Sequence, residues 1–181
     1  MKNIPSVDLN DFLSNDIDKK KAFVSKLGKA YNEIGFVALK GHFLDDNDIK
    51  EVYSSIKEFF DLPEEIKAKY ELDGFDGQRG YTSFGKEHAK GKKHGDLKEF
   101  WHFGQYLDDD EYTKFNYPKN QIVSELPKFN NIGKKVFQSL EKTAIYVLRA
   151  ISLYLDLEED HFDKYVKKGN SILRPIHYPP I

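Results

Sequence analysis

The residues with the clearest potential for chemistry lie at 171–181, in the stretch SILRPIHYPPI. Side chains alternate between the two faces of a β-strand, so Arg174 and Tyr178 are predicted to share a face with two isoleucines. A guanidinium is always charged and offers a planar fork of donors, so it could bind a small carboxylate together with a tyrosine hydroxyl. The alternative, which physical reasoning alone favours, pairs Arg174 with a structural carboxylate and packs the Tyr178 ring in the core.

Two His-x-Asp triplets contain the residue types that bind iron or zinc. His161 and Asp163 lie in a stretch that predicts a short helix, where side chains two residues apart point to nearly opposite faces. His94 and Asp96 would share one side of an extended segment, but His102 is predicted to lie roughly 20 Å from Asp96, too far to complete a site. We therefore predict no metal site within this chain.

Composition narrows the class of protein. The chain has 181 residues, 39% of them hydrophobic and 14% aromatic, which is enough to bury one sizeable core. The 28 Lys and Arg and the 30 Asp and Glu leave a net charge of -2, so the sequence predicts neither nucleic acid nor an anionic membrane as partner. Cysteine is absent, and the first residues form no signal peptide or membrane span. We expect a cytoplasmic protein.

Hydrophobic periodicity predicts the elements that must position the terminal strand. Amphipathic patterns indicate helices over 18–35 and from Asp45 to Pro63, a shorter one after Pro63, and a long one from about Ser124 to Leu155. Short strands are expected at 4–9, 36–41, 80–84, 97–104 and 171–180, and surface loops at 74–95 and 107–120. Helices dominate and strands do not alternate with them regularly, which favours an α+β fold.

Six segments, in this order, resemble motifs of one enzyme family. They are IPSVDL, EIGFVALKGH, FFDLPEEIKAKY, RGYTSFGKE, DLKEFWHFG and LRPIHYPP. The third is very similar to the pattern FFxLPxExKxKY and the last to LRxxYYPP. Together, over nearly the whole chain, they resemble the N-terminal portion of isopenicillin N synthase-like oxygenases, which depend on iron(II) and 2-oxoglutarate.

The resemblance implies a fold and a division of the chain. Residues 1–170 would form the N-terminal helical and strand region, and 171–181 the early strand of a double-stranded β-helix, or jelly roll, that is incomplete in this chain. In such enzymes a His-x-Asp pair and a distant His hold the iron, and an Arg-x-Ser motif holds the cosubstrate. The resemblance places all of these after Ile181, so iron(II) and 2-oxoglutarate are expected for the complete parent and not for this chain alone.

The resemblance also implies roles for four residues. Tyr178 and Arg174 would contact the cosubstrate, although Ile176 and His177 depart from the family pattern on the same strand. Tyr81 and Glu87 would line the substrate entrance, and the alternative for them is an ordinary loop with a packing Tyr and an exposed Glu. The sequence predicts no catalytic and no metal-binding residue within the chain.

Two functions follow as hypotheses. The first is the N-terminal part of an oxygenase that hydroxylates, desaturates or cyclises a small molecule, inactive as these 181 residues alone. The second is a non-catalytic binding module that oligomerises through its unpaired strand, because an unpaired strand edge is a template for another chain. The sequence leaves the substrate open.

Overall fold

The computed structural model describes residues 3–74, 77–88 and 95–180, which divide into two compact units. The first unit holds the chain up to Asp45 together with Gln138–Gly169, and the second holds Asp46–Phe137 and the chain from Asn170 onward. Helix α6, Pro127–Tyr154, contributes residues to both. Within the described residues, no helix combines the length and apolar character that a membrane crossing requires.

The first unit is mostly helical. It contains β1 (Ser6–Asp8), α1 (Leu9–Leu13), α2 (Ile17–Glu33), β2 (Ala38–Lys40), the end of α6 and α7 (Asp163–Val166). Strands β1 and β2 pair in parallel. The Asp16 carboxylate accepts hydrogen bonds from the backbone N–H groups of Asp18 and Lys19, which caps α2 at the start that its hydrophobic period predicts. The buried core is Val7, Leu9, Phe12, Phe23, Leu27 and Ala150.

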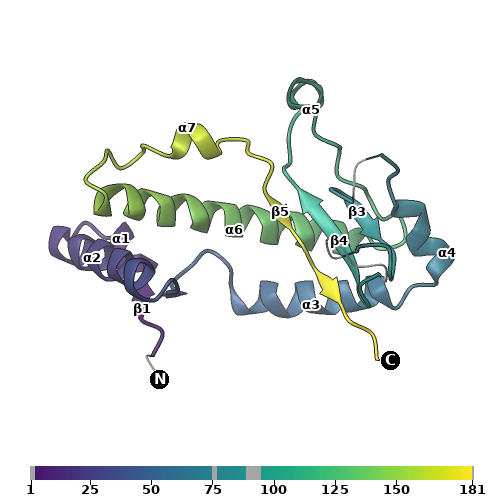
Figure 1. Ribbon diagram of the computed structural model, residues 1–181, viewed down its shortest axis with the longest axis horizontal. Helices are drawn as coiled ribbons and strands as arrows, with labels where there is room; N and C mark the ends of the chain where they lie inside the picture. The colour runs from purple at the N-terminus through teal and green to yellow at the C-terminus, as the bar shows by residue number, and fades with distance from the viewer. Residues whose placement is uncertain (1–2, 75–76, 89–94, 181) are drawn as a thin grey trace. The chain divides into compact units, whose positions relative to one another are not determined.

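The second unit contains α3 (Asp46–Phe60), α4 (Glu64–Lys67), the 3-10 helix η1 (Ala68–Tyr70), α5 (Asp109–Phe115) and the first part of α6. Its strands are β3 (Gly80–Thr82), β4 (Glu99–Gly104), β5 (Ile172–Leu173) and β6 (Ile176–His177). Strand β4 pairs antiparallel with β3 on one side and with β5 and β6 on the other (Figure 1).

Strands β5 and β6 follow one register along β4. Phe103 lies opposite Leu173, and Phe100 lies opposite Ile176, so the two short strands are one strand interrupted at 174–175. Pro175 cannot donate to a ladder, but its carbonyl still accepts a 3.0 Å hydrogen bond from the Trp101 N–H. The predicted terminal strand is therefore present, and its proline occupies the interruption.

An aromatic core joins this sheet to its helices. Phe59 of α3 stacks on Phe129 of α6 with ring centroids 4.9 Å apart, and both rings pack edge-on against Trp101 of β4. Aromatic pairs of this geometry stabilise a core beyond the area that they bury. The buried cluster is Phe59, Phe60, Tyr70, Tyr81, Trp101, Phe103, Val123, Phe129 and Phe137.

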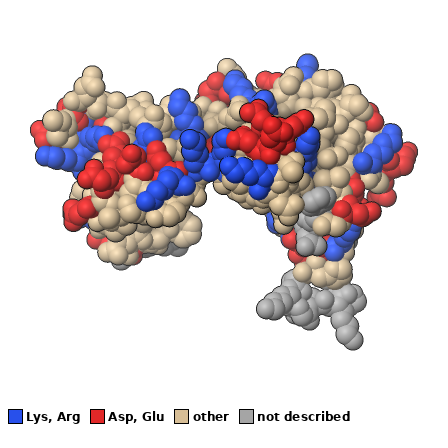
Figure 2. Space-filling view, turned by 90° about the horizontal axis from the view of Figure 1, so that it is seen from above, with Lys and Arg blue, Asp and Glu red and all other residues tan. Residues whose placement is uncertain are grey.

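The structure confirms the mixed fold and the main helices, and it corrects several details. Helix α1 occupies the end of a segment predicted as extended, and α5 lies inside the stretch 107–120 predicted as a surface connection. Asn116 ends α5 in the left-handed region. Tyr31 of α2 and Tyr53 of α3 fall at the helical spacing of the apolar residues, which predicts burial, but they are 41% and 71% exposed. Charges of both signs are interspersed over the face shown in Figure 2, which agrees with the net charge of -2.

Candidate functional site

The two faces of the sheet in the second unit carry different residues. Because side chains alternate along a strand, the register places Tyr81 beside Trp101, and Glu99 beside His177, on the face that packs against α3 and α6. The opposite face is formed by the alternate residues, which are Thr82, Phe100, His102, Arg174, Ile176 and Tyr178.

A buried carboxylate organises the helix-facing side. Glu99 is 5% exposed and accepts hydrogen bonds from Lys67 Nζ at 2.7 Å, from the Tyr81 hydroxyl at 2.5 Å and from His177 Nδ1 at 2.8 Å. Burial by itself raises the pKa of Glu99, but these three donors outweigh it and the pKa is lowered overall. Burial, followed by the hydrogen bond to Glu99, raises the pKa of Tyr81. The carboxylate therefore stays ionised and joins α4, β3, β4 and β6.

This network sets the orientation of the strand that carries Tyr178. His177 points inward to Glu99 and stacks on the ring of Phe60, with centroids 5.2 Å apart. The next side chain along an extended chain points the other way, and Tyr178 is indeed 66% exposed. Arg174 and Tyr178 thus both lie away from the helices, as the alternation predicts.

Arg174 is fixed from two sides on the outer face. Its Nε donates a hydrogen bond to Nε2 of His102, and its guanidinium carbon lies 4.5 Å from the centroid of the Phe100 ring. Nδ1 of His102 is bonded to the Gly77 carbonyl, so Nδ1 carries the proton and Nε2 accepts. Burial, followed by the charge of Arg174, lowers the pKa of His102 to about 4, which keeps the ring neutral.

Glu87 approaches the same guanidinium. Its Oε1 lies 3.8 Å from Arg174 Nη1, and its Oε2 lies 2.7 Å from Lys98 Nζ in an ion pair whose angles are not those of a hydrogen bond. Lys98 also binds Asp96, and the backbone N–H of Asp96 donates to the Glu87 carbonyl at 2.7 Å. The pKa of Lys98 is raised by Glu87 first and by Asp96 next. Sequence reasoning assigned Arg174 and Glu87 to different ligands, and the structure brings them together.

A cavity of about 370 Å³ adjoins this face. Glu87 and Phe100 line it, and so does Thr82, whose hydroxyl is buried without a hydrogen-bond partner among the described residues. Gly77 also lines it, with a φ of +70°, and a Cβ there would lie 2.7 Å from Thr82 Oγ1. Tyr81 borders the cavity too, although its hydroxyl is bound to Glu99.

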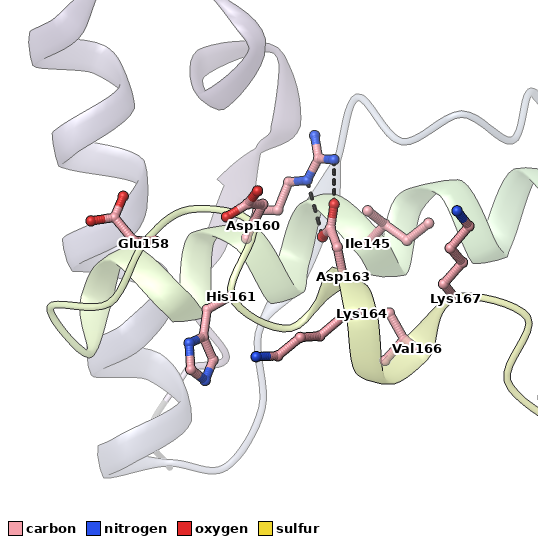
Figure 3. A pocket seen from close by; sticks show the side chains of 9 residues that line it. Ile145, Glu158, Asp160, His161, Asp163, Lys164, Val166 and Lys167 are labelled. Atoms are coloured by element: carbon pink, nitrogen blue, oxygen red, sulfur yellow. Dashed lines mark hydrogen bonds and ion pairs between the residues drawn. The ribbon is translucent and has the colours of Figure 1, made fainter.

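A larger cavity, of about 730 Å³, lies in the first unit and includes His161 and Asp163. In Figure 3 dashed lines mark the bonds of the Asp163 carboxylate, whose partner is the Arg149 guanidinium, and the His161 ring is directed away from Asp163. Arg149 Nη2 lies 2.6 Å from Asp163 Oδ2, and this pairing lowers the pKa of Asp163. The geometry therefore gives the His161 and Asp163 pair no common point for a metal.

The described residues contain no group of three or more His, Asp or Glu side chains that could hold a metal ion. The second His-x-Asp triplet, which the sequence likewise predicts not to complete a metal site, is only partly covered, because His94 lies outside the described residues. Asp96 is bound to Lys98 at 2.9 Å. The ligand set that the family resemblance implies for iron is thus not supplied by the described part of the chain.

Sequence reasoning missed the network around Glu99 and the contact of His102 with Arg174. A signal for the first was present, because Glu99 begins a strand of aromatic residues, where a charge that becomes buried needs a partner. The second follows only from the register of β4 with the terminal strand.

Comparisons with known proteins agree with this geometry. A family model described as non-haem dioxygenase in morphine synthesis N-terminal matches residues 4–125. The chain belongs to this family.

Particular relatives extend the match over the whole chain. The 1-aminocyclopropane-1-carboxylate oxidase of Dictyostelium mucoroides is 29% identical over 187 residues, which cover 99% of this chain and 50% of that protein. The 2-oxoglutarate-Fe(II) type oxidoreductase ppzC of Metarhizium rileyi is 28% identical over 194 residues, covering 98% and 51%. The chain thus spans about half the length of these curated relatives.

Solved structures give the same result. A Caulobacter crescentus protein assigned to the 2OG-Fe(II) oxygenase family has a TM-score of 0.85 and 38% identity, covering 100% of this chain and 58% of that one. A full-length Neurospora crassa protein, solved in complex with alpha-KG, has a TM-score of 0.79 and 26% identity, covering 97% and 51%. The Metarhizium relative and the Caulobacter protein are both named as 2-oxoglutarate- and iron(II)-type oxygenases or oxidoreductases.

Proposed function

We propose that this chain is the N-terminal part of an iron(II)- and 2-oxoglutarate-dependent oxygenase that acts on a small molecule in the cytoplasm. Its helices buttress a sheet that begins a jelly roll, and residues 171–181 form an early strand of that core. The observation that carries the proposal is that segment 172–178 has two different faces. His177 points toward the helices and binds Glu99, whereas Arg174 and Tyr178 point away from them.

The chain's own residues would act by positioning. The exposed hydroxyl of Tyr178 suits a contact to 2-oxoglutarate, since a phenol donates readily to a carboxylate. Glu87 borders the cavity on the same sheet face and suits the substrate entrance, whereas Tyr81 supports it from behind through Glu99. Iron and 2-oxoglutarate supply the oxidising chemistry when bound, and we derive no step through iron because the described residues do not form its site.

The proposal is tested on the protein isolated from its own cells with an antibody against these residues. Its intact mass and its iron content are measured on one sample, and 2-oxoglutarate turnover is followed as succinate. We expect a mass well above 21.1 kDa, near-stoichiometric iron and succinate formation. A mass of 21.1 kDa without iron or succinate would overturn the proposal.

One observation supports the non-catalytic alternative. Within the described residues, β5 and β6 pair only with β4, and Ile172, Ile176 and Tyr178 are 39%, 42% and 66% exposed. An apolar strand of this kind can pair with a second copy of itself. Light scattering on the isolated 181 residues checks this alternative, since self-association predicts a dimer or larger species and a monodisperse monomer contradicts it.

A further inference from the structure

We infer that the outer sheet face binds a small zwitterion, with its carboxylate on Arg174, its ammonium group on Glu87 and its side chain in the adjoining cavity. This inference deepens the proposed function, on which it rests, by naming a substrate class. It assigns Arg174 to the substrate, whereas the family resemblance assigns this residue to the cosubstrate.

The cationic side of the site is built before any ligand arrives. His102 is 3% exposed, neutral and fixed by Gly77, so it accepts the Nε–H of Arg174 and turns the remaining nitrogens toward Glu87. Phe100, also 3% exposed, supports the guanidinium plane. Among the described residues the Nη groups form no hydrogen bond, and the ion pair of Nη1 with Glu87, at 3.8 Å, is too long for one. A planar donor fork is therefore left for a ligand carboxylate.

The anionic side is built in the same way. Lys98 and the Asp96 N–H hold the segment that carries Glu87, and Lys98 occupies Oε2. Oε1 faces Arg174 without a hydrogen bond among the described residues. The Arg174 and Glu87 side chains are 38% and 37% exposed, so a ligand reaches both.

The spacing of these two charges selects between ligand classes. A simple carboxylate on Arg174 would lie beside the negative Glu87, and a simple amine on Glu87 would lie beside the positive Arg174, so each would meet like-charge repulsion. A zwitterion satisfies both groups at once. The adjoining cavity of about 370 Å³, which Glu87 itself lines, has room for the side chain of the zwitterion.

The test uses the full-length protein without iron or 2-oxoglutarate, so that binding is measured apart from activity. The proteinogenic L-amino acids are the probes, screened by ligand-observed NMR and then titrated. We expect at least one to bind with a Kd of about 1 mM or tighter. Its two half-molecules, the amine without the carboxylate and the acid without the amine, should each bind at least about tenfold more weakly.

Variants locate the site. Arg174→Gln and Glu87→Gln should each weaken the best amino acid by at least about tenfold. The matched controls are Lys119→Gln and Asp109→Asn, which remove the same charges from an exposed 2.7 Å ion pair of the same unit and should leave the Kd unchanged. The half-molecule comparison needs no variant, so it stands even if a variant fails to fold.

The possible outcomes distinguish a failure of this inference from a failure of the proposed oxygenase function. No binding by any probe, equal binding by a half-molecule, or unchanged binding in both site variants overturns the zwitterion site. If a zwitterion binds as described but the native protein neither holds iron nor forms succinate, the site stands and the oxygenase proposal fails.

Discussion

The charged groups on the two faces of one small sheet are paired differently. On the helix-facing side, Glu99 has three donors around it and almost no access to water. On the outer side, Thr82 is as deeply buried, yet its hydroxyl is unpartnered among the described residues, and Arg174 and Glu87 face one another beyond hydrogen-bond distance.

This difference distinguishes the residues that stabilise the sheet from the residues that are open to a ligand. A buried charge that has all its partners fixes a structure, whereas two half-exposed charges with no hydrogen bond between them stay open to a ligand. We therefore assign the helix-facing network to stability and the outer groups to binding. Substitutions on each face test that division.

The largest effect is expected from Glu99→Gln. Removing the charge leaves Lys67, 6% exposed, without its carboxylate, and breaking a buried pair in this way costs about 3–5 kcal/mol of unfolding free energy. Urea denaturation measures the loss. The same change at Glu87, on the outer face, should cost at most about 1 kcal/mol. Equal losses at the two positions would refute the division.

A pH effect is expected from His102, the buried group behind Arg174. Its folded pKa is about 4 against 6.5, so between these values the unfolded chain binds more protons and the unfolding free energy falls as the pH is lowered. The loss from this residue is up to about 3 kcal/mol and is complete below the folded pKa. Urea denaturation from pH 7 downward measures it.

The control for this pH effect is His102→Gln, because glutamine offers a donor and an acceptor but does not titrate. The unfolding free energy of this variant should depend less on pH between about 4 and 6.5, whereas the carboxylates titrate mainly at lower pH. An unchanged slope in the variant would assign the effect to other groups.

Adjacent residues of β3 give the sharpest comparison. Tyr81→Phe removes one donor from Glu99 and should cost about 1–2 kcal/mol, since a buried acceptor loses its partner. Thr82→Val removes a buried hydroxyl that has no partner among the described residues, so it should leave stability unchanged or raise it by up to about 1 kcal/mol. Thermal or urea unfolding of the two variants checks this, and a loss of stability for Thr82→Val would mean that its hydroxyl is already satisfied.

The smallest stability effect is expected from Tyr178→Phe. The side chain is 66% exposed, so the unfolding free energy should stay within about 0.5 kcal/mol of the parent. In the full-length protein the Kd for 2-oxoglutarate should rise by about threefold to tenfold, measured by calorimetry. An unchanged Kd would remove Tyr178 from the cosubstrate site.

The sequence predicted the elements better than it predicted the contacts. Helix α6 and strand β4 were found because long periodic patterns are strong local signals. Helix α5 was missed because it has only seven residues and is held partly by side-chain bonds that periodicity does not reveal, such as the 2.9 Å bond from the Tyr112 hydroxyl to the Gln105 carbonyl. The alternative partner foreseen for Arg174, a carboxylate, exists as Glu87, but as a loose ion pair that leaves the guanidinium open.

What the sequence determined by itself was the family, the mixed fold and the two faces of the terminal strand, because ordered motifs and side-chain alternation are local properties. Only the tertiary structure decided which charge meets which. Lys67 and Glu99 are 32 positions apart, and Arg174 and His102 are 72 apart. Such pairs depend on strand register and on the packing of the helices against one face, and no local pattern encodes either.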